Sequence, residues 1–412
     1  MSNISLSIKN FGPIRIANIE TKRYNFFIGR TSSGKSVAAK LITISNEFDF
    51  RTIQDDDFEA FVKMLGKYNI DFKFKDDTEI KIKENDKYWI IKKDVFKTNN
   101  KSEDFIELKK ANNKELLDQF KSFLASGSTL VNEFTNSILT LLSSGDIDKS
   151  KLSKEQVEYL RLILWGAFKG FIYDPIYIPS ERILLSIMKN SVFTLLHSGG
   201  SVPESIVKFG SRYEQAKSKI KDLDMDFMDV RVSFSKDEDK ILLKDLTEVD
   251  FLHASSGLQS IIPLWTVLQN ELSQDMYHPF IVVEEPELNL FPIQQVALIR
   301  EIISKMHNTK SSIVFTTHSP YILSVVDNMI LADDIYKKAK GNKKKQTEIT
   351  NIVSKKEFIP FKDIASYGFN DDGTVVDIRD IENHLTGAIS IDQASNETSR
   401  IFSKLLDIED EL

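Results

Sequence analysis

The sequence contains no cysteine. This excludes disulfide bonds, thiolate zinc sites and cysteine nucleophiles, and it suits a reducing compartment, so we expect a cytoplasmic protein. Long apolar runs are also missing: the longest, Leu160 to Tyr173, contains Arg161 and Lys169 and is too short to span a bilayer. Residues 1–10 lack the uninterrupted apolar region of a signal peptide. We therefore expect no membrane contact.

An excess of basic residues is missing as well. The chain of 412 residues has a net charge of −7, so any contact with DNA or RNA would need a local basic patch. With 41% hydrophobic and 28% charged residues, the chain can bury a large core and is long enough for two or three structural units.

One segment has the pattern of a phosphate-binding loop. An apolar run, Tyr24 to Ile28, precedes a turn bounded by glycines, and a helix-forming run follows from Val37. Phosphate oxygens need inward-pointing N–H groups, a turn free of Cβ clashes and a cation. The residues expected to bind the phosphates of ATP are Gly29, Arg30, Thr31, Ser32, Ser33, Gly34, Lys35 and Ser36. The Ser36 hydroxyl would also ligate Mg²⁺.

Two further segments place polar side chains at the ends of buried strands. The apolar run 279–283 is followed by Glu284 and Glu285, and buried carboxylates are costly unless they meet a cation. Beside a phosphate loop, Glu284 can ligate Mg²⁺ and Glu285 can accept a proton from the attacking water. A second strand, expected at 312–317, ends at His318, which we assign to the position of a γ-phosphate.

A second anion site is predicted at Ser255, Ser256 and Gly257. This turn precedes an apolar helix expected from Ile261 to Leu272, and the N-terminus of a helix favours anions. One nucleotide does not need two such turns in one chain, so the second turn would serve the nucleotide of a partner. The alternative is an ordinary helix start without a ligand.

Periodicity predicts the remaining elements. Alternating residues predict strands at 4–8 and 16–19, and a three-stranded antiparallel sheet with one hydrated face at 71–75, 79–83 and 87–91. Helical periodicity is found at about 112–173 and 203–223, with a flexible joint at 198–201 and two strands at 229–235 and 240–246. The tail would form a turn at 371–373 and helices near 378–385 and 396–406.

Together these motifs resemble those of a known group. The phosphate loop, Ala254-Ser255-Ser256-Gly257-Leu258-Gln259, Glu284-Glu285-Pro286-Glu287 and Thr316-Thr317-His318-Ser319-Pro320 resemble, in this order, ABC-type ATPase heads of the SMC, RecF and OLD branch. The chain is similar above all to the AAA-type ATPases of prokaryotic anti-phage systems such as PARIS and Septu. The loop at 177–182, Tyr-Ile-Pro-Ser-Glu-Arg, also looks like theirs. The resemblance covers roughly residues 1–50 and 174–332.

The resemblance implies an α/β fold. It would be an ABC-type P-loop ATPase head with a mixed sheet and an antiparallel β subdomain, a helical insertion and a small C-terminal α+β extension. We divide the chain accordingly into an N-terminal ATPase lobe (1–98), a mainly helical insertion (99–225), a C-terminal ATPase lobe (226–335) and an extension (336–412). The strand and loop at 174–182 would return from the insertion to the head.

The resemblance also implies a mechanism. Two heads would enclose two ATP molecules, with Ser255 of one head capping the γ-phosphate held by the other, so the protein would act as a dimer or a higher homo-oligomer. Gln54 is a further candidate for a glutamine that senses Mg²⁺ and the attacking water. OLD nucleases continue into a Toprim domain, but only residues 319–412 follow His318, so we expect no Toprim nuclease domain.

Two functions fit these features. The first is an ATPase that acts as sensor and scaffold for a separate effector, a nuclease or toxin, in bacterial anti-phage defence. The alternative is a DNA-binding ATPase of repair or recombination, similar to RecF and SMC. The segment Lys337–Lys345 contains six lysines and is either a solvated loop or a patch that contacts nucleic-acid phosphates.

Overall fold

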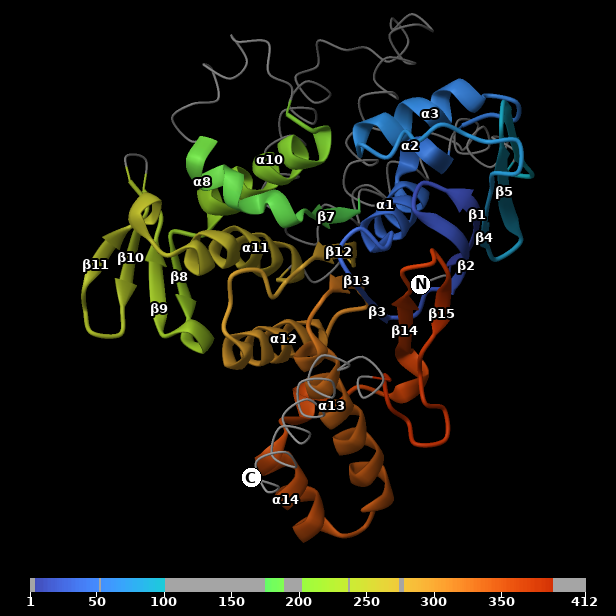
Figure 1. Cartoon of the computed structure of the whole chain (residues 1–412). Helices are drawn as coiled ribbons and strands as arrows, with labels where there is room; N and C mark the ends of the chain where they lie inside the picture. Colours follow the sequence, from blue (N-terminus) through green and yellow to red (C-terminus); the bar gives the residue numbers. More distant parts are fainter. Residues whose placement is uncertain are drawn as a thin grey trace, which may run out of the picture.

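The computed structural model describes residues 4–51, 53–100, 175–188, 202–235, 238–273 and 278–387 (Figure 1). Three expectations lie outside these ranges: the helical region at 112–173, the joint at 198–201 and the helix at 396–406. None of the helices within the described ranges combines the length and the apolar character needed to cross a bilayer.

A six-stranded sheet forms the centre of the molecule and confirms the expected α/β class. Its strand order is β15-β14-β3-β13-β12-β7. The bounds are β3 (Tyr24–Gly29), β7 (Ile176–Ile178), β12 (Phe280–Glu284), β13 (Ser312–Thr317), β14 (Ile364–Phe369) and β15 (Val375–Asp377). The sheet is mixed, because β15 is antiparallel to β14 while the other pairs are parallel.

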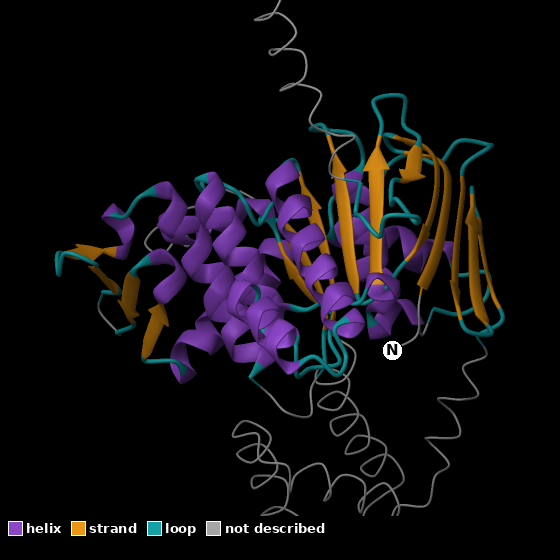
Figure 2. Ribbon diagram, turned by 90° about the horizontal axis from the view of Figure 1, so that it is seen from below, coloured by secondary structure: helices purple, strands orange, loops and turns teal. Residues whose placement is uncertain are grey.

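The two faces of this sheet pack against different layers. On one face, Phe26 and Phe315 share a core with α11 (Ser256–Leu272), α12 (Pro292–Met306) and α13 (Pro320–Lys338). On the other face, Phe27 and Val314 share a core with α1 (Lys35–Asn46) and a second sheet. Figure 2 shows most helices on one side of the central strands and the curved second sheet on the other. Burial on both faces explains the apolar centres of β12 (Ile281–Val283) and β13 (Ile313–Phe315).

The second sheet is antiparallel, with the order β2-β1-β4-β5-β6. Its strands are β1 (Ile4–Phe11), β2 (Ile14–Glu20), β4 (Glu79–Glu84), β5 (Lys87–Lys92) and β6 (Val95–Thr98). The strands predicted near 4–8, 16–19, 79–83 and 87–91 are confirmed. In β4, Ile80 and Ile82 are buried while Lys81 and Lys83 are exposed, so the hydrated face is confirmed as well.

The strand predicted at 71–75 is wrong, because this segment has no ladder partner. β1 already pairs with β2 on one side and with β4 on the other. Phe72 and Phe74 pack instead against Phe11, with ring centroids 5.5 and 5.3 Å apart. The alternation of this segment therefore reflects aromatic packing over the end of β1.

A third, smaller sheet lies beside α10 (Glu204–Lys219) and α11 (Figure 1). It is antiparallel, with the order β11-β10-β9-β8. Its strands are β8 (Asp222–Met225), β9 (Val230–Ser233), β10 (Lys240–Leu243) and β11 (Glu248–Asp250). Short elements elsewhere are α2 (Phe48–Arg51), α3 (Phe58–Lys67), the 3-10 turn η1 (Ser180–Ile183) and α8 (Leu184–Met188).

The C-terminal region corrects two expectations. The segment Lys337–Lys345, called the lysine run below, is not a single loop. Helix α13 extends to Lys338, and α14 (Lys343–Ile352) starts after a short turn. The helix expected at 378–385 is absent. There the Asp380 carboxylate accepts hydrogen bonds from the N–H groups of Glu382 and Asn383, and Asp380 pairs with Leu385 in a β-bridge. Such local side-chain bonds favour turns over helices.

The four-part division of the chain stays a prediction. The third sheet runs across the expected boundary after residue 225, since β8 pairs with β9. Helix α13 runs across the boundary after residue 335. From the expected extension, β14 pairs with β3 at the centre of the molecule.

Candidate functional site

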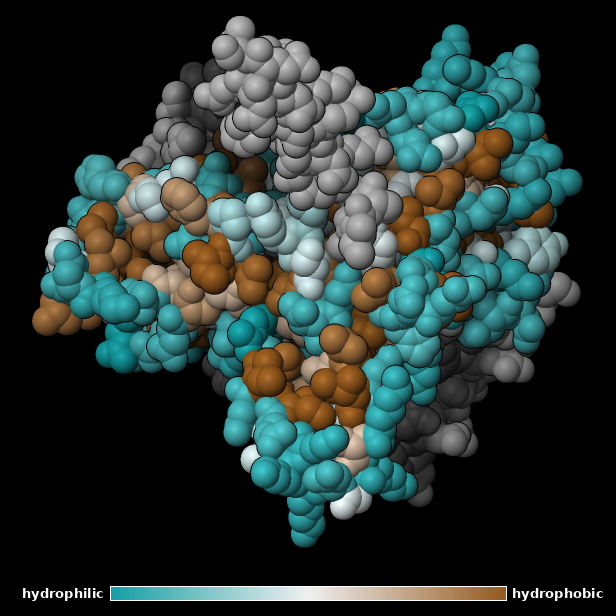
Figure 3. All heavy atoms as spheres, turned by 60° about the horizontal axis from the view of Figure 1, so that its bottom comes forward, coloured by the Kyte–Doolittle hydropathy of each residue, from teal (hydrophilic) through white to brown (hydrophobic). Residues whose placement is uncertain are grey.

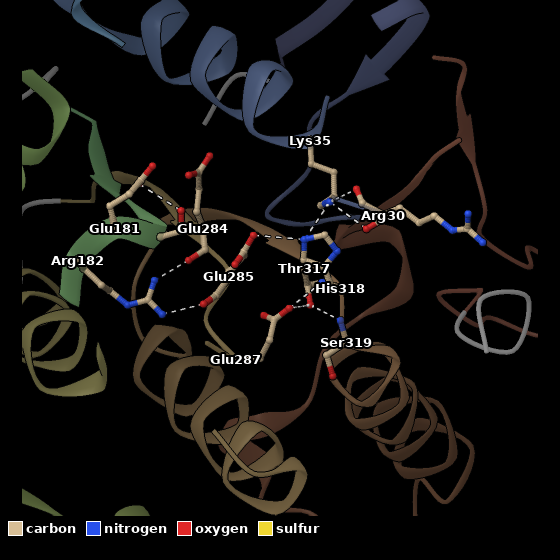
Figure 4. A network of polar contacts seen from close by, with 12 residues as sticks. Arg30, Lys35, Glu181, Arg182, Glu284, Glu285, Glu287, Thr317, His318 and Ser319 are labelled. Carbon is tan, nitrogen blue, oxygen red and sulfur yellow. Dashed lines mark hydrogen bonds and ion pairs between the residues drawn. The ribbon is translucent and has the colours of Figure 1, made fainter. Parts of the chain in front are cut away.

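Parallel pairing brings the three predicted strand ends together. Glu284 of β12 lies opposite Thr316 of β13, and Thr317 lies opposite Ile28 of β3. The phosphate loop, the carboxylates after β12 and the segment after β13 therefore meet at one edge of the sheet. Figure 4 shows their side chains converging there.

The phosphate loop leaves donors unpaired at the start of α1. Gly34 is the N-cap residue of this helix, makes no side-chain cap, and has φ of 101°, which favours glycine. The first turn of α1 contains no acidic residue. The Ser33 hydroxyl is buried and has no hydrogen-bond partner within the described part of the chain. Free N–H groups at the positive end of a helix form an anion site, so this loop fits phosphate.

Lys35 is buried at the centre of the site. Its Nζ donates to the carbonyl oxygens of Gly29 and Arg30, at 2.9 and 2.8 Å, and lies 3.4 Å from His318 Nε2. Burial lowers the pKa of Lys35 to about 8, against the opposing charges of Glu285, Glu287 and Glu284. The ammonium group therefore lies where an anionic ligand would relieve an unfavourable burial.

Glu285 and His318 contact each other. Glu285 Oε1 lies 3.2 Å from His318 Nε2, and this hydrogen bond lowers the pKa of the carboxyl group, which is therefore ionised at neutral pH. Glu285 has a φ of 43°, a conformation that non-glycine residues rarely adopt. Backbone strain of this kind collects at functional sites.

Glu284 is the best candidate for a metal ligand. Its side chain is buried, and no hydrogen-bond partner of its Oε1 is found among the residues that the structure describes. Burial raises the pKa of Glu284, against the charge of Lys40 and the hydroxyls of Tyr177 and Ser36, which approach the carboxylate. A buried carboxylate with an unpaired oxygen beside a serine hydroxyl fits Mg²⁺, which needs few protein ligands when phosphates supply the others.

Gln54 is not brought into this arrangement. It is exposed in the segment before α3, and within the described residues no hydrogen bond joins it to Ser36 or Glu284. Its assignment as a metal ligand stays a prediction.

The part played by Glu287 was not predicted from the sequence. Its Oε1 accepts hydrogen bonds from Thr317 Oγ1, at 2.6 Å, and from the N–H of His318, at 2.7 Å. Next to it, Ser319 Oγ donates to Gln295 Oε1, and Gln295 Nε2 donates to the carbonyl of Leu290. These bonds fix the backbone that carries His318. The carboxylate was visible in the sequence, but its partners were not.

A second missed feature is the hairpin between β14 and β15. Asp371 in its turn forms an ion pair with Arg30 of the phosphate loop, at 3.0 Å, and Asp372 pairs with Arg15 at 2.9 Å. A Cβ on Gly29 would lie 2.4 Å from the carbonyl oxygen of Phe369, so β14 packs directly on the start of the loop. The predicted turn at 371–373 thus lies beside the site.

The Ser-Ser-Gly turn of residues 255–257, called the serine turn below, lies at the start of α11. Ser255 is the N-cap residue, and its Oγ accepts a hydrogen bond from the N–H of Leu258. Ser255 and Ser256 are exposed, and within the described residues neither is hydrogen-bonded to the phosphate loop. Within the described residues, no hydrogen bond therefore joins the two predicted anion sites of one chain.

A comparison with known protein families covers all parts of this site. A family model described as "AAA domain, putative AbiEii toxin, Type IV TA system" matches residues 24–324, which include the phosphate loop, the serine turn, Glu285 and His318. A search of curated proteins found no significant match.

Solved SMC heads are similar in structure, at low scores. One is the SMC head domain from Thermotoga maritima, with 12% identity, a TM-score of 0.37, and coverage of 79% of this chain and 92% of that one. Another is the Smc head from Pyrococcus furiosus with an extended coiled coil, bound to the C-terminal domain of ScpA, with 13% identity, a TM-score of 0.35 and the same coverage. These scores are too low to support an argument about function.

The buried ammonium group of Lys35 predicts a pH dependence of stability. The pKa of Lys35 is about 8 in the folded protein and 10.5 in the unfolded chain, so between these values only the unfolded chain binds the proton. Raising the pH through this window should therefore stabilise the parent relative to Lys35→Met, with no change in the difference below pH 8. Urea unfolding of both proteins at several pH values measures this. A difference that stays constant or falls across the window would contradict the burial of the charge.

Proposed function

The chain belongs to the family described as "AAA domain, putative AbiEii toxin, Type IV TA system", and from this premise we propose that it is an ABC-type ATPase that binds and hydrolyses ATP. The proposal rests on the convergence of three side chains beside an uncapped helix N-terminus. His318 Nε2 lies 3.4 Å from Lys35 Nζ and 3.2 Å from Glu285 Oε1.

Each residue has a distinct part in the proposed reaction. The N–H groups at the start of α1 and the Lys35 ammonium group bind the β- and γ-phosphates, and Lys35 exchanges its loop carbonyls for phosphate oxygens. Ser36 and Glu284 would hold Mg²⁺, which when bound neutralises charge on the transferred phosphoryl group. Glu285, ionised at neutral pH, accepts the proton of the attacking water. His318, held by Glu287 through its backbone, orients Glu285 and faces the phosphate.

We assign completion of the site to a second copy of the chain. Ser255 and Ser256 are exposed, and within the described residues no hydrogen bond joins them to the phosphate loop of their own chain, which suits a turn that caps the nucleotide of another head. Phe291 and Ile293, at the start of α12, are 77% and 75% exposed near this turn. Figure 3 shows several brown hydrophobic patches among hydrophilic side chains on the face of the molecule that it displays. In the proposed dimer these two exposed apolar side chains would be covered by the partner.

The biological role is proposed as control of a separate effector, a nuclease or toxin, in anti-phage defence. The family description refers to a toxin and to a type IV toxin–antitoxin system, and this supports a place among such systems. The ATPase would then act as sensor and scaffold, with ATP occupancy setting the oligomer that the effector recognises. Purifying the chain with the product of a neighbouring gene, and measuring mass and nuclease activity with and without ATP, tests this role.

Hydrolysis should depend on Glu285. Replacing it by Gln removes the proton acceptor but keeps the shape, so we expect a rate lower by about 10²–10⁴-fold with ATP binding retained. Lys35→Ala should lose binding. The control is Glu301→Gln on α12, which should turn over ATP like the parent. Phosphate release measures turnover, and a fluorescent ATP analogue measures binding. Turnover of Glu285→Gln at the parental rate would contradict the assignment of Glu285 as the proton acceptor.

The shared site predicts complementation. Ser255→Arg and Lys35→Ala should each be inactive, because one blocks the cap and the other the phosphate loop. Mixed in equal amounts they should regain up to about one quarter of the parental rate, because half of the dimers are mixed and each has one intact site of two. Ser273→Arg, at the other end of α11, is the control and should stay active. No recovery despite mixed oligomers in native mass spectra would contradict the model.

A second candidate function, DNA binding of the RecF or SMC kind, rests on the tip of the α13–α14 hairpin. This hairpin forms the lower end of the molecule in Figure 1. All six lysines between Lys337 and Lys345 are exposed, and Lys343, Lys344 and Lys345 make up the first turn of α14. Cations are unfavourable at the positive end of a helix, and a phosphate backbone would relieve this repulsion.

Salt dependence tests this candidate. If the tip contacts duplex DNA, replacing Lys343, Lys344 and Lys345 by Gln should lower the slope of log affinity against log salt by up to about 0.9 per lost contact. The ATPase rate without DNA should not change. The matched control replaces Lys9, Lys81 and Lys83, exposed lysines of the five-stranded sheet, and should leave the slope unchanged. No binding by the parent at low salt would exclude the DNA contact.

A further inference from the structure

Arg182 lies in the loop after β7 and is completely buried, with 0% exposure. Among the described residues, its guanidinium group donates to main-chain carbonyls and to no side chain. Nε binds the carbonyl of Ser260 at 3.0 Å, Nη1 binds those of Pro179 at 3.1 Å and Glu284 at 2.7 Å, and Nη2 binds that of Glu285 at 2.7 Å. Figure 4 shows the fork turned toward Glu284 and Glu285.

A buried cation without a carboxylate partner is unusual. Among the described residues no ion pair involves Arg182. Burial lowers the pKa of Arg182 to about 10, opposed by the charges of Glu287, Glu285, Glu284 and Glu181, so the group remains charged at neutral pH. Its desolvation is compensated by carbonyl dipoles from three elements at once. The planar fork of arginine can reach several acceptors in fixed directions, and a lysine cannot.

The hydrogen bond from Arg182 Nη2 fixes the backbone of Glu285, the proposed catalytic base. Glu285 has the rare φ of 43°, its N–H donates to the carbonyl of Thr316 at 2.9 Å, and its own carbonyl is held by Arg182. The peptide groups on both sides of Glu285 are therefore pinned. This backbone directs the carboxylate toward His318.

The hydrogen bond from Arg182 Nε reaches α11 close to the serine turn. Ser260 lies in the first turns of α11, shortly after Ser255 and Ser256. A second contact joins the same two regions: a Cβ on Gly257 would lie 2.7 Å from the carbonyl oxygen of Asn289, so the serine turn packs directly on the turn after Glu285. A displacement of the start of α11 should therefore also shift the backbone at Glu285.

We propose that Arg182 is a positioning residue that couples the serine turn to Glu285 of the same chain. The inference rests on the proposed function, in which the serine turn caps the nucleotide of the partner. ATP held by one head would then set the geometry of the base in the other head. The one intact site of a mixed Ser255→Arg and Lys35→Ala dimer should then work below the uncoupled maximum of about one quarter of the parental rate, because the head that holds ATP has a mutated serine turn and a partner without ATP.

The test compares two arginine-to-lysine variants of the full chain. Arg182→Lys should bind ATP within about twofold of the parent, with KM changed by no more than the same factor, but should lose about 10- to 100-fold in kcat, because a misplaced catalytic group costs this much. Its rate against ATP should follow a Hill coefficient of 1, where the parent exceeds 1. The matched control is Arg23→Lys, because Arg23 also donates to backbone carbonyls, those of Met306 and Thr309, at the opposite edge of the sheet.

The outcomes separate this inference from the proposed function. If the parent shows no hydrolysis that depends on Glu285, the proposed ATPase is wrong. If the parent hydrolyses ATP and Arg182→Lys keeps the parental kcat and Hill coefficient, only the coupling is overturned. Equal losses in Arg182→Lys and Arg23→Lys would also overturn it, because they would reflect stability alone.

A second variant decides the question if Arg182→Lys does not fold. Gly257→Ala keeps the arginine but pushes the serine turn away from Asn289, and it should lower kcat and the Hill coefficient while a single head still binds ATP. Gly66→Ala, at a helical glycine with open space around its Cβ position, is the control for the substitution. Parental kinetics of Gly257→Ala would overturn the coupling.

Discussion

The parallel pairing of β3, β13 and β12 is the constraint on which the rest of the site depends. It aligns Ile28 with Thr317 and Thr316 with Glu284, although these residues are far apart in the chain. A slip of one residue would turn each side chain to the opposite face. The register is held because both faces are buried, with Phe26 and Phe315 in one core and Phe27 and Val314 in the other. The two cores thus fix the chemistry at the strand ends.

The charges at this edge are balanced in different ways. Lys35 and Arg182 are held by main-chain carbonyls, and Glu287 is held by the hydroxyl of Thr317 and an N–H group. Among the described residues at this edge, buried side-chain atoms without a hydrogen-bond partner include Glu284 Oε1, Glu287 Oε2 and the hydroxyls of Ser33 and Thr316. The N–H groups at the start of α1 have no side-chain cap. Buried polar groups are normally satisfied. Of these, the Glu284 Oε1, the Ser33 hydroxyl and the donors at the start of α1 are the ones that the proposed ATP and Mg²⁺ would meet.

The sequence predicted elements well where a local pattern decided the structure. The glycine-bounded loop, the buried strands β12 and β13, and the helix after Ser255 all follow from short-range rules of turn, strand and capping. Predictions failed where neighbours decided. Residues 71–75 alternate like a strand, but both edges of β1 were already occupied. The lysine run has the composition of a loop, but most of it lies within α13 and α14, whose ends it forms.

The sequence by itself determined which side chains carry the proposed chemistry, because Lys35, Glu285 and His318 each follow a strand with a recognisable pattern. Only the tertiary structure decided how they are held. Arg182 binds carbonyls of Pro179, Ser260, Glu284 and Glu285, and the β14–β15 hairpin lies against the phosphate loop. Every residue has a carbonyl group, so no sequence pattern identifies the ones that a buried arginine will bind. That choice is made by packing between segments distant in the chain.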